Sequence, residues 1–143
     1  AQPDGTRTPA DFMQGKWTIA YLGDGACDER CQKALYLSRQ TWIALNKDMD
    51  RVQRVFLATG PRVDTQFLTK EHGDLRVAIL KDDAASNSLL AEFPVLDGVA
   101  PAAAGRLYLI DPLGNLMMRF PKDADPSRMK KDLAKLLRAS RVG

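Results

Sequence analysis

The spacing of apolar residues changes several times along this chain, and these changes constrain its fold more than any other feature. Segments that are rich in β-branched and aromatic residues, or that alternate apolar with polar positions, predict strands at residues 17–22, 52–58, 75–80, 106–110 and 116–120. Helical spacing predicts helices at residues 28–45, 64–73, 83–93 and from 125 to the last basic residues. Strands that alternate with helices predict an α/β fold with a central mixed sheet and helices on both faces.

The last third of the chain contains a predicted hairpin and helix that indicate a more specific fold within the α/β class. Asp111-Pro112-Leu113-Gly114-Asn115 is a turn sequence between the last two strand-like segments and predicts a β-hairpin. A helix follows, with Asp125 as its N-cap, Pro126 as its first residue, and an apolar stripe formed by Met129, Leu133, Leu136 and Leu137. A hairpin before the last helix of an alternating chain resembles the thioredoxin-like fold.

Length and charge limit the number of domains and the kind of partner. The 143 residues suffice for one domain, which we expect at residues 16–143, after a leader or linker at residues 1–15. No apolar run is long enough to span a bilayer. The net charge of +3 is uneven, because residues 106–143 hold nine Lys/Arg against four Asp/Glu. Most of these cations fall on one predicted helix without an aromatic platform, so we expect a solvated face and no nucleic-acid partner.

The only two cysteines, Cys27 and Cys31, lie where the first predicted strand meets the first predicted helix. The positive end of a helix dipole stabilises a thiolate and lowers the pKa of its thiol. Residues four apart on a helix have Cα atoms roughly 6 Å apart, which is close enough for a disulfide. The same spacing lets both thiolates face one soft metal ion.

Three interpretations of this pair stay open. A reversible dithiol is favoured, since such sites usually lie at the ends of strands in α/β sheets. A Cu(I) site is the second interpretation, whereas zinc needs a third ligand and only His72 remains as a nitrogen donor. A structural disulfide is the third; closing so short a loop stabilises a protein by only about 2 kcal/mol.

Three motifs in register resemble the Sco/SenC family of thioredoxin-like proteins of cytochrome c oxidase assembly. They are Gly15-Lys16-Trp17-Thr18-Ile19-Ala20-Tyr21-Leu22 with Cys27-x-x-x-Cys31, then Pro61-Arg62-Val63-Asp64-Thr65, and finally Tyr108-Leu109-Ile110-Asp111-Pro112-Leu113-Gly114. The resemblance implies a membrane-tethered domain in an oxidising compartment such as the periplasm. It also implies copper binding, or thiol–disulfide exchange, directed at the binuclear copper site of the oxidase.

The chain departs from the family at three positions. Gln32 stands where the family usually has a proline, Gly60 where it has an aspartate, and Ala103 where it has its copper-ligating histidine. We do not expect His72 to replace that ligand, because the end of a short helix leaves its ring in water. Met117 and Met118 cannot serve one site, since adjacent strand residues point to opposite faces, and both are expected to pack in the core.

The resulting prediction is a monomeric, periplasmic thiol–disulfide oxidoreductase of cytochrome c oxidase assembly, tethered to the inner membrane by an anchor preceding residue 1. Cys27 would attack and Cys31 would resolve the mixed disulfide. Its partner would be a cytochrome c oxidase subunit or another copper or redox assembly protein. The alternative is a Cu(I) carrier that delivers copper to the oxidase through Cys27 and Cys31. A further alternative is a non-catalytic interaction module.

The missing histidine generates a prediction of its own. Cu(II) prefers nitrogen donors, so the native chain should bind it weakly. Ala103→His should raise the affinity for Cu(II) by about tenfold or more, and a thiolate-to-copper absorption band should appear and vanish with Cys27→Ser. Paired copper titrations with spin-resonance spectroscopy measure this. An unchanged affinity would show that residue 103 does not face the cysteines.

Overall fold

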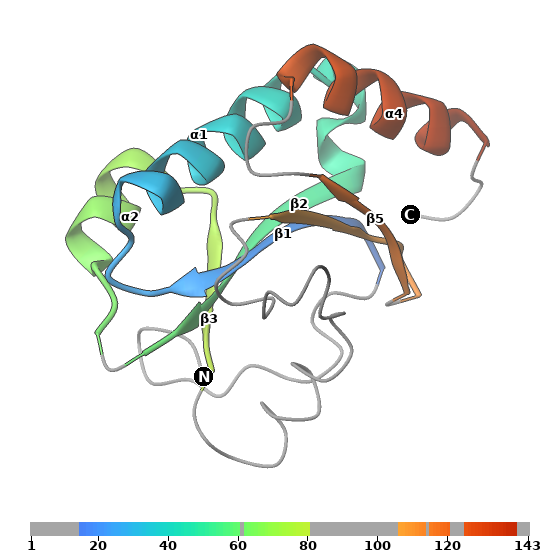
Figure 1. Cartoon of the computed structure of the whole chain (residues 1–143). Coiled ribbons are helices and arrows are strands. Elements are labelled where there is room, and N and C mark those ends of the chain that lie inside the picture. Colours follow the sequence, from blue (N-terminus) through green and yellow to red (C-terminus); the bar gives the residue numbers. More distant parts are fainter. Residues whose placement is uncertain (1–14, 61, 81–105, 114, 121–124, 140–143) are drawn as a thin grey trace.

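The computed structural model describes residues 15–60, 62–80, 106–113, 115–120 and 125–139, and its centre is one five-stranded sheet (Figure 1). The strands are β1 (Trp17–Asp24), β2 (Val52–Thr59), β3 (Arg76–Ile79), β4 (Leu107–Ile110) and β5 (Leu116–Phe120). Their order is β3-β2-β1-β4-β5, with β1, β2 and β3 parallel and β4 antiparallel to both of its neighbours. The predicted mixed sheet is therefore confirmed, as is the hairpin.

The described helices cover one face of this sheet. They are α1 (Glu29–Ile43), α2 (Thr65–Glu71) and α4 (Pro126–Ala139), and each contributes buried side chains to the same apolar cluster. Figure 1 shows α1 and α4 side by side above the strands. The helix predicted at residues 83–93 lies outside the described residues, so the expectation of a helix on the second face is not tested there.

Both faces of the central strands are buried, which explains their nearly continuous apolar sequence. In β1, Ile19 and Tyr21 point into the cluster beneath the helices, whereas Ala20 and Leu22 point into a second cluster on the opposite face. Alternation along β5 separates the two methionines. Met118 packs against the first cluster, but Met117 is 46% exposed, so its predicted core position is wrong.

The predicted first helix ends earlier than expected. α1 stops at Ile43, and a 3-10 helix, η1 (Asn46–Arg51), connects it to β2. The Trp42 indole Nε1–H lies 3.1 Å from the carbonyl oxygen of Met49 and 2.9 Å from that of Val52. Trp42 therefore links α1 to the connection between α1 and β2 through these two hydrogen bonds. The sequence of η1 is polar and lacks any apolar period, so it gave no helical signal.

Aspartates begin the helices and close the hairpin, and Asp125 does so as predicted. The Asp28 carboxylate accepts from the backbone N–H of Cys31 at 3.0 Å, and that of Asp64 accepts from the N–H of Phe67 at 3.1 Å. Asp125 accepts from the N–H of Ser127 at the start of α4. The Asp111 carboxylate binds two N–H groups of its own turn, those of Leu113 and Asn115. Capping of this kind stabilises a helix by about 1 kcal/mol.

Candidate functional site

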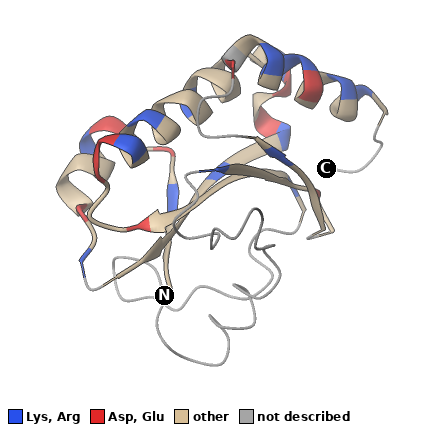
Figure 2. Cartoon of the chain, viewed as in Figure 1, with Lys and Arg blue, Asp and Glu red and all other residues tan. Residues whose placement is uncertain are grey.

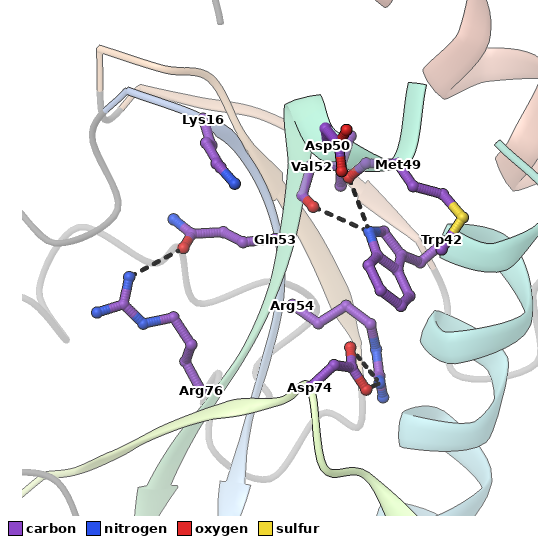
Figure 3. A pocket seen from close by; sticks show the side chains of 9 residues that line it. All are labelled: Lys16, Trp42, Met49, Asp50, Val52, Gln53, Arg54, Asp74 and Arg76. Atoms are coloured by element: carbon purple, nitrogen blue, oxygen red, sulfur yellow. Dashed lines mark hydrogen bonds and ion pairs between the residues drawn. The ribbon is translucent and has the colours of Figure 1, made fainter. Parts of the chain in front are cut away.

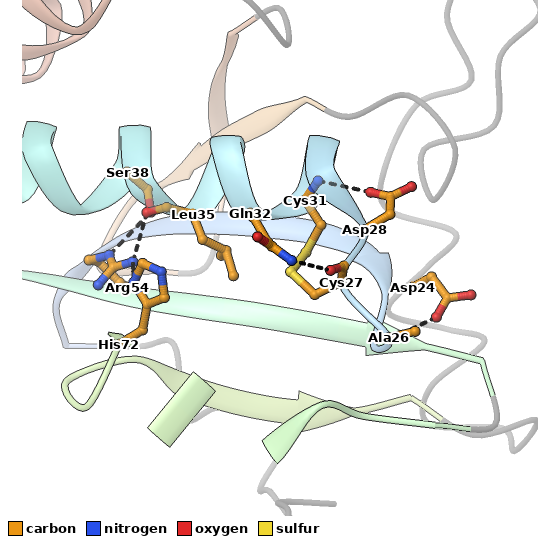
Figure 4. The surroundings of a disulfide bond; sticks show 10 residues. All are labelled: Asp24, Ala26, Cys27, Asp28, Cys31, Gln32, Leu35, Ser38, Arg54 and His72. Atoms are coloured by element: carbon orange, nitrogen blue, oxygen red, sulfur yellow. Dashed lines mark hydrogen bonds between the residues drawn. A yellow bond between two sulfur atoms is a disulfide. The ribbon is translucent and has the colours of Figure 1, made fainter. Parts of the chain in front are cut away.

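The structure joins Cys27 and Cys31 in a disulfide at the point where β1 passes into α1 (Figure 4). Their Cα atoms are 4.9 Å apart, and each cysteine is only 2% exposed. Both cysteines are thus buried in the described structure. Exchange with a partner disulfide would require the loop around Cys27 to move, so that the partner can reach the buried sulfur atoms.

The two cysteines do not share a helix, contrary to the expected spacing on one helical face. Cys27 precedes the N-cap Asp28 and has a φ of +50°, whereas Cys31 is the third residue of α1. The left-handed backbone at Cys27 turns the chain back toward the helix. Consequently the Cα–Cα distance is shorter than the roughly 6 Å between residues four apart on a helix.

Local hydrogen bonds hold the loop around Cys27. Its backbone N–H donates to the carbonyl oxygen of Asp24 at 3.1 Å. Its own carbonyl oxygen accepts from the side-chain amide of Gln32, also at 3.1 Å. Gln32 stands where the Sco/SenC motif usually has proline, and a proline could not make this bond. This departure therefore supplies a contact that fixes the disulfide loop.

The charges at the start of α1 act in opposite directions on a thiolate. Asp28 occupies the cap and Glu29 the first turn, where both carboxylates compete with a thiolate for the positive helix end. Arg30, the cation of this first turn, interacts with the hydroxyl of Tyr21. Burial raises the pKa of Tyr21, and the neighbouring Arg30 partly offsets that rise.

A second loop braces the cysteine loop. The N–H of Gly25 donates to the carbonyl oxygen of Thr59 at 2.8 Å, and the carbonyl oxygen of Gly25 accepts from the N–H of Asp64 at 2.9 Å. A Cβ at Gly25 would lie 2.5 Å from the carbonyl oxygen of Arg62, so only glycine fits between the loops. The segment that resembles the family's second motif thus packs directly against the disulfide loop.

Sequence analysis missed a buried arginine beneath the same helix. Arg54 on β2 is 1% exposed, and its Nη1 lies 2.9 Å and 3.0 Å from the two carboxylate oxygens of Asp74. Its Nη2 donates to the carbonyl oxygen of Leu35 at 2.9 Å, and its Nε donates to Ser38 Oγ at 3.1 Å. Strand alternation was the available signal, because it places residue 54 on the same face as the buried Val52 and Phe56.

The predicted position of His72 is wrong. The residue is 5% exposed instead of hydrated, and its Nδ1 lies 2.9 Å from Nη2 of Arg54. Burial, and then the charge of Arg54, lower the pKa of His72. A neutral ring with Nδ1 as acceptor fits this environment. Figure 4 shows His72 grouped with Arg54 and Ser38, apart from the disulfide.

These positions define what the site offers to copper. The two sulfur atoms are soft donors that fit Cu(I) once the disulfide is reduced. Within the described residues, no three His, Cys, Asp or Glu side chains are grouped to hold a metal ion. Ala103 lies outside those residues. The described chain thus provides two of the ligands that a copper site needs.

A surface pocket of about 360 Å³ lies at the other end of the parallel strands (Figure 3). Lys16 precedes β1, Gln53 is near the start of β2 and Arg76 begins β3, so the pocket opens at the amino edge of the sheet. The indole of Trp42 and the Arg54–Asp74 ion pair form another part of its wall. It shares no residue with the disulfide loop.

Comparisons with known proteins agree with this geometry. A family model described as a transmembrane-like, thioredoxin-like, C-terminal domain matches residues 17–140. No curated protein matches the chain by sequence.

Solved structures match over nearly the whole chain. They include copper-bound ScoI of Bradyrhizobium japonicum, with 20% identity, a TM-score of 0.70 and 94% of each chain covered. Copper-bound ScoI of Arabidopsis thaliana has 20% identity and a TM-score of 0.76, covering 96% of this chain and 93% of that one. A putative thioredoxin from Neisseria meningitidis has 17% identity and a TM-score of 0.64, covering 98% and 87%. The predicted thioredoxin-like fold is confirmed.

The disulfide should contribute modestly to stability, because it closes a short loop. Denaturant unfolding of the oxidised and reduced protein should give free energies that differ by about 2 kcal/mol. The variant Cys27→Ser/Cys31→Ser should unfold alike with and without reductant. A difference well above about 3 kcal/mol would identify the disulfide as a structural staple.

The environment of His72 should make the protein less stable in mild acid. Its pKa is lower in the folded than in the unfolded chain, so stability is fully present above about pH 6.5 and is lost as the pH falls below that value. The free energy of unfolding, followed by tryptophan fluorescence, should fall with a slope of up to about 1.4 kcal/mol per pH unit. His72→Asn, whose Oδ1 can accept from Arg54, should flatten this slope.

The chain has a single histidine, so its ring titrates without overlap in NMR spectra. A folded-state pKa at or above about 6.5 would contradict the buried environment. An unaltered slope in His72→Asn would assign the acid sensitivity to other groups.

Proposed function

The chain belongs to the family of transmembrane-like, thioredoxin-like C-terminal domains, and on this premise we propose that it is a Sco-type thiol–disulfide oxidoreductase of cytochrome c oxidase assembly. One observation carries the proposal: Cys27 and Cys31 form a disulfide where a parallel strand ends and the first helix begins. Ligand and reaction sites of α/β sheets lie at this edge.

The exchange needs only the two cysteines. In the reduced protein, the Cys27 thiolate attacks a sulfur of a partner disulfide, and the partner's other sulfur leaves as a thiolate that takes up a proton. The Cys31 thiolate then attacks Cys27 Sγ, closes the Cys27–Cys31 bond and releases the second partner thiol. Two electrons pass to the partner. The reverse sequence oxidises a partner dithiol and reduces the bond seen in the structure.

The local geometry favours Cys27 as the attacking thiol. Cys27 lies in the loop before the N-cap, whereas Cys31 is part of the first turn, with its own N–H bound to Asp28. The first-turn N–H groups of a helix point away from its body toward the residues that precede it. They can therefore stabilise a thiolate on Cys27 more readily than one on Cys31.

The proposed place of action rests on the resemblance to the Sco/SenC family. We assign the protein to the periplasm, tethered to the inner membrane, with a cytochrome c oxidase subunit or another copper or redox assembly protein as its partner. A disulfide persists in such an oxidising compartment. No helix among the described residues is long and apolar enough to cross a bilayer.

The second candidate function is a Cu(I) carrier. It is supported by the fold shared with copper-bound Sco structures and by the two soft sulfur donors. Copper would be cargo held by Cys27 and Cys31, and a further ligand would come from the partner or from residues outside the described part of the chain. If neither exchange nor copper binding occurs, the chain is a non-catalytic interaction module.

Equilibration in glutathione buffers tests the first function. Alkylation and mass spectrometry of the quenched protein should give a reduction potential between about −120 and −270 mV, the range of thioredoxin-like exchange proteins. A potential below about −300 mV would instead indicate a purely structural bond. A parallel Cu(I) titration against a competing chelator, with Cys27→Ser/Cys31→Ser as control, tests the carrier. Tight binding that the control loses would favour copper delivery.

The order of the two thiols is testable separately. Alkylation of the reduced protein across pH should label Cys27 first. Cys31→Ser should accumulate a mixed disulfide with glutathione through Cys27, whereas Cys27→Ser should accumulate less. The opposite pattern in this matched pair would make Cys31 the attacking residue.

A further inference from the structure

The outward face of α4 presents a row of four cations. Arg128, Lys131, Lys135 and Arg138 are all exposed, and they recur at intervals of three, four and three residues. At about 100° per residue they fall within about 80° of the helix circumference. Met129, Leu133 and Leu137, each 1% exposed, form the buried stripe on the opposite side. Figure 2 shows blue segments along the ribbon of α4, which lies at the outside of the molecule.

Helix stability explains only part of this row. Arg138 lies in the last turn of α4, where a cation interacts favourably with the helix dipole, but Arg128 lies near the positive N-terminal end. Like charges three or four residues apart destabilise a helix by about as much as opposite charges stabilise it. α1 follows the stabilising pattern, with Lys33 and Glu29 paired one turn apart. Within the described part of the chain, none of the four α4 cations forms an ion pair. The only acid on α4 is Asp132, which is half-buried beside the row.

We propose that this face of α4 docks the protein on an anionic phospholipid surface. A straight row of cations on a convex face can meet a flat sheet of headgroup phosphates with all four side chains at once. No large apolar side chain is exposed on α4, so contact would stay at the level of the headgroups and be reversible. The face also lacks aromatic residues on which nucleic-acid bases could stack.

The overall charge distribution supports this orientation. Residues 106–143 carry nine cations and four anions, or +5, whereas residues 1–105 carry twelve and fourteen, or −2. An anionic surface would therefore turn the end of the chain that contains α4 toward itself. Figure 1 places α4 beside the part of α1 remote from the helix start. Docking through α4 would leave the loop that contains the disulfide free of contact with the lipid surface. The docking proposal depends on neither the proposed redox chemistry nor the proposed tether.

Co-sedimentation with lipid vesicles tests the proposal on the whole chain. Vesicles of phosphatidylcholine with about a third phosphatidylglycerol should bind the protein, and pure phosphatidylcholine should not. The variant Arg128→Gln/Lys131→Gln/Lys135→Gln/Arg138→Gln should bind at least about tenfold more weakly, because each cation at an anionic surface strengthens binding about fivefold. Raising the salt from about 0.05 M to about 0.3 M should release the native protein.

A matched variant removes the same charge elsewhere. Its substitutions are at exposed lysines outside α4, namely Lys16→Gln, Lys33→Gln, Lys47→Gln and Lys70→Gln. This variant should keep most of the vesicle binding, and circular dichroism should show both variants folded. Equal losses in the two variants would overturn the proposal, since net charge alone would then explain binding. Tighter binding to a DNA duplex than to the vesicles at the same salt would also overturn it.

Discussion

The buried guanidinium of Arg54 connects the elements on which the rest of the structure depends. Its partners come from α1, through Leu35 and Ser38, and from the segment between α2 and β3, through His72 and Asp74. Removing one partner of a fully buried ion pair costs about 3–5 kcal/mol. The cost here is smaller, because Asp74 is 30% exposed and water screens its charge. The charge is satisfied only when α1, β2 and the α2–β3 connection have all assembled. Arg54 therefore specifies how α1 sits on the sheet.

This placement of α1 positions one half of the disulfide. Cys31 lies one turn before Leu35, whose carbonyl oxygen accepts from Arg54. Cys27 is positioned separately, by the end of β1 and by the bonds that join Gly25 to the loop after β2. The disulfide thus links α1, which is hydrogen-bonded to Arg54, to a loop that is hydrogen-bonded to the segment after β2. Reduction would remove the covalent link and leave both supports in place, as a reversible dithiol requires.

Local patterns predicted much of the fold and the position of the cysteines. Strand alternation, the Asp125 cap and the hairpin turn all act within a few residues, and each was predicted from its own segment. The errors arose where distant residues decide the outcome. Arg54 and Asp74 are 20 residues apart in the sequence. His72 is buried where it contacts Arg54, which is 18 residues away. No local pattern shows that a histidine at a helix end will be covered.

The departures from the Sco/SenC motifs affect thiol–disulfide exchange less than they affect copper binding. Thiol–disulfide exchange requires the two sulfur atoms and a stable loop, and Gln32 supports that loop through the carbonyl of Cys27. Delivery of Cu(I) could use the same two sulfur atoms, whereas Cu(II) would need nitrogen donors as well. His72, the only histidine, already directs Nδ1 at Arg54. The described residues hold both sulfur atoms that exchange needs, and His72 is not placed to add a nitrogen donor to them, so we favour exchange as the proposed function.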